Sequence, residues 1–517
     1  MLMHTLSSAT LLLALSSLAL GAAPTSTTHA SLSSAQQLAT CLKSLGSKVL
    51  TSTSSAYAKE RYAFDLRYTF QPQVIVMAKT ESDVQLAVTC AKASNIAVTP
   101  RSGGHSFEGY SIGGQNGSLV VDLGGFNTVK VQKNGKKAKV GAGVRLGKLY
   151  LELFNQGGWT INAGTCPSVG IGGHALGGGF GLMGRKYGLL VDRVVEMEMV
   201  NANGELLTVS ATQNQDLFFA LRGAGGGSYG VVTSFTILPF KPAPKVTSFT
   251  YEWKFSDYAA VLKAYIAFQS TGTRDVGLEM NVGASGLELY GIFQGTKSNQ
   301  AAAVASFLKA APKPQNADVR ESRYIDALLR FAFVEGGSDS DKNINALALQ
   351  SPYHSGDSHY TKGKSLIYPS ALQPSTIALI GKWVAQKPKG STANYIIVDL
   401  WRGAVQDTAV SATSFVHRNA HSVFEFVVEW DESSNAKPGK PDCQPCLQWM
   451  NNMYAEFLAD FKANYSGGVR GYQNYIDMGM PNWMDAYYGQ ALPRLKQIKA
   501  SADPTNVFRF PQSIPLK

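Results

Sequence analysis

Two glycine-rich segments of this 517-residue chain have the composition of turns that hold an anionic group. The first is residues 101–106 (Arg-Ser-Gly-Gly-His-Ser); the second is residues 164–174, which contain Cys166 and His174 and run on into the glycines at 177–179. Successive small residues let backbone N–H groups approach a diphosphate closely. The second segment is not the fingerprint of nicotinamide-binding folds, because no strand–turn–helix unit with an acidic residue about 20 positions on surrounds it. Each segment taken alone is a weak signal.

The five cysteines suit an oxidising compartment and leave one thiol over. Cys41 and Cys90 could pair across the N-terminal region, and Cys443 and Cys446 are close enough in sequence to pair locally. The Cys-x-x-Cys spacing also fits a redox centre or half of a zinc site, but a single such motif is a weak metal signal, so a disulfide is favoured. Cys166 is the odd cysteine.

The N-terminus predicts export. Short apolar runs at 11–15 and 18–20 precede small residues that could be cleaved, so we expect residues 1–21 to be a signal peptide and the protein to be secreted and extracellular. No later stretch reaches the length of about 18 apolar residues that a membrane span needs. Asn116 and Asn464 begin sequons that a secretory pathway could glycosylate.

Composition and charge are those of a globular enzyme. Hydrophobic residues make up 44% of the chain and charged residues 16%, and the length suggests two domains. The net charge of +11 raises the question of nucleic acid. However, the densest basic stretch, residues 130–148, alternates lysine with Val, Gly and Ala, which is typical of a solvated sheet edge and lacks aromatic stacking residues. We expect no nucleic acid partner.

Short strands and helices surround the glycine segments. The pattern predicts a helix over 80–94, beginning at an acidic capping segment, and strands at 74–77, 96–100, 119–123 and 194–200. Residues 239–244 (Pro-Phe-Lys-Pro-Ala-Pro) break the composition and indicate a domain boundary.

The pattern of polar and apolar residues changes after this boundary. From about 246 to 469, alternating strands such as 249–253 and 423–427 mix with an Ala-rich helix at 301–311. This pattern predicts an antiparallel sheet with helices on one side. His354 and His359 bracket Asp357 and could suggest a metal, but their place in a polar loop favours a solvated loop, so no metal site is expected.

Taken together, several segments resemble the berberine-bridge-enzyme-like branch of the vanillyl-alcohol-oxidase flavoprotein family. They are residues 101–114, 164–181, 221–232, 503–506 and 510–515, and the resemblance covers nearly the whole mature chain. It implies an α+β fold of two domains, of the PCMH type, with an antiparallel-sheet substrate domain. It places the FAD-binding domain at 22–245, the substrate-binding domain at 246–469, and at 470–517 a C-terminal segment that completes the FAD-binding domain.

The resemblance also implies FAD attached through two covalent bonds. The family's flavin 8α-methyl carbon is bonded by a histidine at the position of His105, and its ring carbon C6 by a cysteine at the position of Cys166. Two attachments should raise the reduction potential of the flavin, which favours hydride acceptance. His174 is expected to hydrogen-bond within the glycine loop. The other implied cofactor contacts are Arg101, Ser102, Gly103, Gly104, Ser106, Thr165, Val169, Gly170, Gly172, Gly173, Val232 and Asn474.

The family's catalytic base is the second tyrosine of a Tyr-x-Asn-Tyr motif, which is Tyr475 here. A phenol with a pKa near 10 is a poor base unless it is tuned, and Asp399 matches the aspartate that the carbohydrate oxidases use for this. By strand periodicity Tyr395 and Ile397 share the face of Asp399. Ile397 stands where those oxidases have a glutamine, and Phe107 replaces a common tyrosine. Both changes are less suited to sugar hydroxyls.

These residues suggest a monomeric oxidase that converts a CH–OH group with molecular oxygen and releases hydrogen peroxide. Tyr475, helped by Asp399, would remove the hydroxyl proton while hydride passes to flavin N5. The small residue Val169, third after Cys166, implies an oxidase rather than a dehydrogenase. The preferred substrate is a mono- or oligosaccharide, oxidised at C1 to the lactone. One alternative is an alkaloid, polyketide or terpenoid alcohol, and another is a secreted flavin-binding protein with little catalysis.

Overall fold

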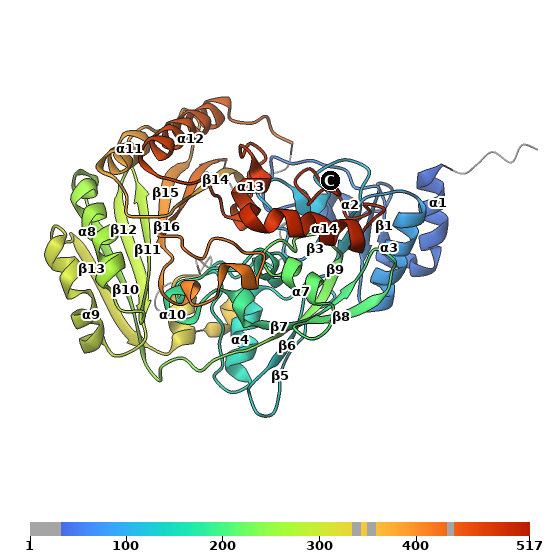
Figure 1. Ribbon diagram of the computed structural model, residues 1–517, viewed down its shortest axis with the longest axis horizontal. Helices are drawn as coiled ribbons and strands as arrows, with labels where there is room; N and C mark the ends of the chain where they lie inside the picture. Colours follow the sequence, from blue (N-terminus) through green and yellow to red (C-terminus); the bar gives the residue numbers. More distant parts are fainter. Residues whose placement is uncertain (1–32, 333–342, 349–357, 432–438) are drawn as a thin grey trace, which may run out of the picture.

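The computed structural model describes residues 33–332, 343–348, 358–431 and 439–517 (Figure 1). The expected signal peptide at 1–21 lies outside these ranges, as do His354 and Asp357. Within them, no helix combines the length and the apolar character needed to cross a membrane. The described strands form three sheets.

The first sheet carries the first glycine segment at the end of one of its strands. Its strand order is β1-β2-β4-β3, with β3 and β2 each parallel to β4. The strands are β1 Val49–Leu50, β2 Val74–Met77, β3 Val98–Arg101 and β4 Leu119–Asp122. The crossover between β2 and β3 is α3 (Glu81–Ala93), as parallel strands require. Its first turn is closed by a capping box between Thr80 and Asp83, which confirms the predicted acidic helix start.

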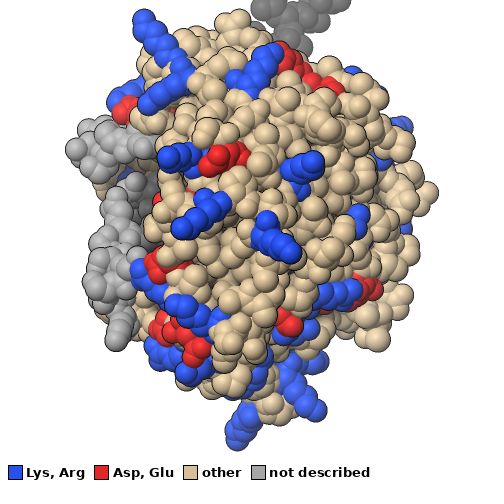
Figure 2. Space-filling model, turned by 90° about the vertical axis from the view of Figure 1, so that its left-hand side faces the viewer, with Lys and Arg blue, Asp and Glu red and all other residues tan. Residues whose placement is uncertain are grey.

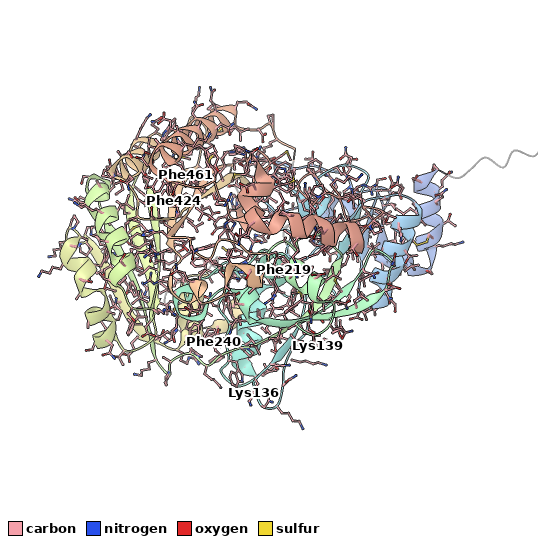
Figure 3. The ribbon with its side chains drawn as sticks, in the orientation of Figure 1. Lys136, Lys139, Phe219, Phe240, Phe424 and Phe461 are labelled. Carbon is pink, nitrogen blue, oxygen red and sulfur yellow. A yellow bond between two sulfur atoms is a disulfide. The ribbon has the colours of Figure 1, made fainter. Side chains whose placement is uncertain are left out.

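The second sheet is antiparallel, in the order β5-β6-β9-β7-β8. Its strands are β5 Val129–Val131, β6 Ala138–Gly141, β7 Val194–Val200, β8 Leu206–Ser210 and β9 Val231–Ile237. The predicted basic hairpin is β5–β6 at the sheet edge. Figure 3 shows Lys136 and Lys139 on this hairpin. The hairpin ends sooner than expected, since Lys148 lies on α4 (Leu146–Asn155).

The third sheet is the large antiparallel one that the alternating pattern predicts. Its order is β13-β10-β12-β11-β15-β16-β14. The strands are β10 Val246–Trp253, β11 Val276–Gly283, β12 Gly286–Phe293, β13 Asn316–Ser322, β14 Tyr360–Tyr368, β15 Ala393–Leu400 and β16 Ser422–Trp430. Four helices cover its outer face (Figure 1): α8 Tyr258–Thr271, α9 Lys297–Ala310, α11 Pro374–Val384 and α12 Gln444–Asn464.

An aromatic core joins this sheet to α12. The ring of Tyr368 on β14 lies 4.7 Å from that of Phe424 on β16 and 5.6 Å from that of Phe461 on α12. Figure 3 shows Phe424 and Phe461 together between the sheet and the helix. The side of the molecule that these covering helices present to solvent carries basic and acidic side chains interspersed over it (Figure 2).

After α12 the chain returns to the first two sheets, where α13 (Trp483–Tyr488) and α14 (Leu492–Ala502) cross them (Figure 1). Lys499 of α14 is buried, and its Nζ lies 2.7 Å from Asp503 Oδ2 and 2.8 Å from the Ser228 carbonyl. The remaining described α-helices are α1 Ser34–Cys41, α2 Tyr57–Glu60, α5 Ile171–Leu176, α6 Gly184–Tyr187, α7 Gln215–Leu221 and α10 Tyr324–Arg330.

Both expected disulfides are formed. Cys41 and Cys90 join α1 to α3, with their Cα atoms 5.6 Å apart, and Cys443 bonds Cys446 at the start of α12. Cys166 lies outside both disulfides on an exposed loop.

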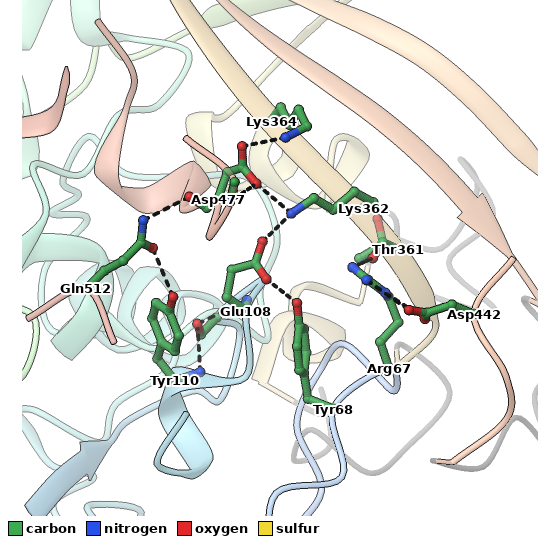
Figure 4. Close-up of polar contacts among 12 residues, drawn as sticks. Arg67, Tyr68, Glu108, Tyr110, Thr361, Lys362, Lys364, Asp442, Asp477 and Gln512 are labelled. Carbon is green, nitrogen blue, oxygen red and sulfur yellow. Dashed lines mark hydrogen bonds and ion pairs between the residues drawn. The ribbon is translucent and has the colours of Figure 1, made fainter. Parts of the chain in front are cut away.

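A buried ion cluster ties β14 to two distant segments (Figure 4). Lys362 Nζ contacts Glu108, and it lies 2.7 Å from Asp477 Oδ1; Lys364 Nζ lies 2.7 Å from Asp477 Oδ2. Burial opposes the ionised form of Asp477, but the two lysines hold its pKa below the usual value. Gln512 donates a hydrogen bond to the Asp477 carbonyl. Next to the cluster, Arg67 and Asp442 form a second, bidentate pair.

We expect Lys362→Met to destabilise the protein by about 3–5 kcal/mol, because Glu108 and Asp477 would remain buried with less compensation. The matched control is Lys382→Met, which removes a lysine from an exposed pair with Glu456 and should cost less than about 1 kcal/mol. Denaturant unfolding followed by tryptophan fluorescence measures both changes. Equal losses in the two variants would contradict a structural role for the cluster.

Candidate active site

A cavity of about 790 Å³ lies where the two glycine segments meet the inner face of the seven-stranded sheet. All the predicted cofactor, catalytic and substrate residues except Arg101 and Asp399 line it. Arg101 is instead fully buried beside its cross-strand partner Asp122, with its Nε 2.6 Å from the Asp122 carboxylate. Arg101 therefore anchors the start of the first glycine segment to β4 and does not line the cavity.

The two glycine segments touch backbone to backbone. A Cβ atom on Gly103 would lie 2.1 Å from the nitrogen of Gly170, and one on Gly170 would lie 2.2 Å from the nitrogen of Gly103. Neither contact could be relieved by a side-chain rotation, so both positions require glycine. Ser102 pins the junction: its hydroxyl donates to the Ala142 carbonyl at 2.6 Å and accepts from the Gly172 N–H at 3.2 Å. The result is a narrow backbone cradle suited to an anionic group.

The ring of His105 is held by packing in the cavity wall. Its ring stacks on Phe64 at 4.3 Å, and its buried Nε2 has no hydrogen-bond partner among the described residues. Burial, together with the positive charges of Arg145 and His359, lowers its pKa to about 3. At neutral pH the imidazole is therefore uncharged and nucleophilic. Cys166 lines the same cavity. It lies near Tyr395, whose pKa is raised mainly by burial and by neighbouring carboxylates and to a smaller extent by Cys166.

His174 orders the second glycine segment, as expected: its Nε2 accepts a hydrogen bond of 3.1 Å from the Gly164 N–H. The Tyr-x-Asn-Tyr motif is anchored to the same segment. Asn474 Nδ2 donates to the His174 carbonyl at 3.0 Å and to the Tyr472 hydroxyl at 2.8 Å. The Tyr472 hydroxyl in turn accepts from the Gly179 N–H at 3.1 Å. These bonds place Tyr475 relative to the cradle.

The phenol of Tyr475 lies in the cavity, close enough to Glu425 of β16 to lower the pKa of that carboxyl against the effect of burial. Burial and the charges of Glu425, Asp399 and Glu279 raise its pKa well above the ordinary value. The sequence predicted that Asp399 would make Tyr475 a better base. In the structure Glu425 also lies close to the phenol, and the charges of Glu425 and Asp399 both disfavour the phenolate.

Glu279, Asp399 and Glu425 are neighbours on the cavity side of the sheet, although Asp399 does not itself line the cavity. Glu279 on β11 is the direct cross-strand partner of Asp399 on β15, and Glu425 on β16 is the partner of Ile397, two residues from Asp399. Glu279 also accepts a hydrogen bond from the Tyr290 phenol. Sequence reasoning missed Glu279 and Glu425. Both stand at polar positions within alternating strands, but only the pairing of the strands shows that they face the same cavity.

Burial and mutual repulsion keep these carboxyls protonated well above their usual range. The pKa of Glu425 is raised to about 8 by burial and by Glu279, and that of Glu279 to about 7 by burial and by Glu288, against its bond from Tyr290. Asp399 is 1% exposed, and burial with the charges of Glu279 and Glu425 raises its pKa well above the ordinary value.

The predicted substrate residues form the adjoining wall. Tyr395 donates to Glu429 Oε1 at 3.0 Å, Ile397 lies on the same face, and the Phe107 ring lies 6.3 Å from that of Tyr475. His359 departs from the expected solvated loop. It is in the cavity wall, with Nε2 3.2 Å from Glu429, because a β-bridge to Asp65 draws its backbone inward.

Comparisons with known proteins agree with this geometry. Residues 72–210 match the model of the FAD binding domain, and residues 471–515 match the model described as berberine and berberine like. A xylooligosaccharide oxidase from Thermothelomyces thermophilus is 30% identical, over 92% of this chain and 93% of its own.

Solved structures show the same architecture. BBE-like 1 from Physcomitrella patens superposes with a TM-score of 0.84 at 35% identity, covering 93% of this chain and 99% of its own. A glucooligosaccharide oxidase from Acremonium strictum, described with a 6-S-cysteinyl, 8α-N1-histidyl FAD, superposes with a TM-score of 0.82 at 25% identity, covering 93% and 99%. The expected two-domain α+β fold is thereby confirmed.

The raised pKa of Glu425 predicts a pH-dependent stability. Between about pH 4.5 and 8 the folded state keeps the proton that the unfolded state has lost, so this contribution is fully present below pH 4.5 and is lost as the pH rises. Glu425→Gln should gain stability relative to wild type by up to about 1.4 kcal/mol per pH unit across that window. Thermal and denaturant unfolding at pH 5, 6, 7 and 8 measures the change.

The control is Glu456→Gln on α12. The bond from Lys382 lowers the pKa of Glu456, so its titration lies below this window. The difference between that variant and wild type should stay constant from pH 5 to 8. Parallel pH profiles for Glu425→Gln and wild type would show that Glu425 is already ionised in the folded protein.

Proposed function

Because the chain belongs to the berberine-bridge-enzyme-like branch of the vanillyl-alcohol-oxidase flavoprotein family and is an FAD-dependent oxidoreductase, we propose that it oxidises a CH–OH group of a mono- or oligosaccharide. The reaction would convert the C1 hydroxyl to the lactone, with molecular oxygen as acceptor and hydrogen peroxide as product. The xylooligosaccharide and glucooligosaccharide oxidases among its relatives support this substrate class.

One observation carries the proposal: Tyr475 and the nearby Glu425 line the same cavity as His105 and Cys166. A substrate hydroxyl bound against Tyr475 would pass its proton to the phenolic oxygen while the phenol passes its own proton to Glu425. The phenol need not ionise first, which accounts for a base whose pKa is raised. Glu425 must be ionised to accept, so substrate turnover should favour pH values toward and above its pKa of about 8.

The residues of the cavity fit FAD. The Gly103–Gly170 cradle suits a diphosphate, and the neutral imidazole of His105 in the cavity wall suits a bond to the flavin methyl carbon. We propose a second covalent bond at Cys166. When bound, FAD would accept hydride from the substrate carbon and be reoxidised by oxygen. Val169 lines the cavity, and its small size is consistent with oxygen access.

Further proposals concern the setting of the enzyme. We propose that residues 22–245 and 470–517 bind the cofactor, that 246–469 bind the substrate, and that the protein is a secreted monomer. Asn116 and Asn464 are both exposed, as glycosylation requires. A secondary-metabolite alcohol is the second candidate substrate, because Ile397 and Phe107 make part of the cavity wall apolar.

We expect the flavin to stay with acid-precipitated protein. His105→Ala and Cys166→Ala should each retain one covalent bond, whereas the double variant should release FAD into the supernatant. Flavin absorbance of pellet and supernatant, with mass spectrometry of the intact chain, measures the attachment. Free FAD from precipitated wild type would disprove covalent attachment, while leaving the oxidoreductase assignment intact.

We expect Tyr475→Phe to lower peroxide release by about 100- to 10,000-fold, because it removes the proton-transferring oxygen with little loss of volume. The assay screens mono- and oligosaccharides beside simple and aromatic alcohols. The control is Tyr258→Phe on α8, which removes a phenol far from the cavity and should keep wild-type turnover. Unchanged turnover in Tyr475→Phe, with flavin loading preserved, would rule out this base.

A further inference from the structure

We propose that the sheet face of the cavity is a subsite for a positively charged group, so that the preferred substrate is an amino-bearing sugar or alcohol rather than a neutral one. The inference rests on the proposed alcohol oxidation and specifies its substrate class. It starts from an imbalance of charge in the cavity wall.

Several acidic side chains line the cavity, and one of them, Glu429, lies 3.2 Å from His359 Nε2. Glu279, Glu425 and Glu429 all face it, and no lysine or arginine is among its lining residues in the described part of the chain. The nearby lysines of β14, Lys362 and Lys364, are engaged by Glu108 and Asp477 in the buried cluster. Once ionised, Glu279 and Glu425 would repel a negatively charged substrate from this wall.

The carboxyls are close enough to act on one ligand. Directly opposed residues of an antiparallel pair have Cβ atoms about 4.5–5.5 Å apart, which is the relation of Glu279 to Asp399. Glu425 is one diagonal step further, opposite Ile397. Glu279 accepts a hydrogen bond from the Tyr290 phenol, and the Tyr475 phenol lies close to Glu425. Because a phenol is neutral, it does not offset the repulsion between the carboxyls when they are ionised.

Unpartnered acceptors point to the missing group. Asp399 is 1% exposed, and its Oδ1 has no hydrogen-bond partner among the described residues. The buried Oδ1 of Asn281, which lines the cavity two residues from Glu279, has none either. Asp399 does not line the cavity, so the acceptors within reach of a ligand there are Asn281 Oδ1 and the carboxyls of Glu279 and Glu425. An ammonium group brings three donors and no acceptor, whereas each sugar hydroxyl brings acceptors of its own.

Other cations fit less well. Among the described residues, no group of three or more His, Cys, Asp or Glu side chains is arranged to hold a metal ion. An organic ammonium needs no such arrangement and can lie between two carboxyls. The raised pKa values of Glu279 and Glu425 are consistent with this occupant, because a bound cation would let a carboxyl ionise and offset its repulsion by the others.

The test uses three disaccharides that share one β-1,4-linked skeleton and differ at C2: chitobiose with amines, cellobiose with hydroxyls, and N,N′-diacetylchitobiose with neutral amides. Peroxide release by the holoenzyme gives kcat/KM for each at pH 7. We expect chitobiose to exceed cellobiose and the diacetyl compound by about tenfold or more. Values for chitobiose and cellobiose within twofold of one another would overturn the inference and leave the proposed oxidation standing.

Glu279→Gln tests the wall itself. The variant keeps the acceptor oxygen and removes the charge, so the ratio of chitobiose to cellobiose should fall by at least about fivefold, whatever happens to the absolute rates. Glu456→Gln on the exposed face of α12 is the matched control and should keep the wild-type ratio. An unchanged ratio in Glu279→Gln would overturn the role of this carboxyl.

A binding measurement tests the charged subsite independently of the proposed oxidation. If none of the three sugars reduces the flavin, the proposed oxidation of sugars fails. Titration of the holoenzyme with each sugar, followed by the flavin absorbance spectrum, then still decides the subsite: chitobiose should bind about tenfold more tightly than cellobiose. Equal affinities would overturn the inference independently of turnover.

Discussion

The buried ion pairs of Lys362 fix the relative positions of the cofactor segment, the substrate sheet and the Tyr-x-Asn-Tyr motif. Its ammonium group bridges Glu108 and Asp477, partners that are 254 and 115 residues away in the chain. Glu108 follows His105 by three residues, and Asp477 follows Tyr475 by two. The cofactor segment, the substrate sheet and the motif of the proposed base therefore meet at one buried charge. Such a charge tolerates little displacement, because any partner that moves away leaves an ion in a low-dielectric interior.

The site built on this junction combines two kinds of recognition. On one side, glycine backbones approach so closely that no side chain fits between them, and the groups offered are main-chain N–H donors. On the other side, a rigid antiparallel sheet offers carboxyl and phenol side chains at fixed spacings. Strands position side chains more accurately than loops do. The backbone cradle suits a bound cofactor, and the sheet suits the substrate and the proton.

Much of the fold followed from local patterns. The strands at 74–77 and 194–200, the capped helix after Thr80 and the Cys443–Cys446 pair depend on neighbours in the sequence, and the structure contains them. The Cys41–Cys90 disulfide, also expected, joins residues 49 positions apart. The antiparallel sheet followed from alternation, which reports one buried and one polar face. Family resemblance supplied the cofactor segments, all of whose predicted members except Arg101 line the cavity.

The sequence by itself determined which residues could carry the chemistry. They are His105 and Cys166 in the glycine-rich turns and Tyr475 in the Tyr-x-Asn-Tyr motif. Only the tertiary structure decided their partners. Glu425 lies close to Tyr475. Glu279 opposes Asp399 because strand register joins residues that are more than a hundred positions apart in the chain. Alternation shows which side chains share a face of one strand, but it carries no information about which strand lies beside it. The charge of the cavity is a property of that pairing.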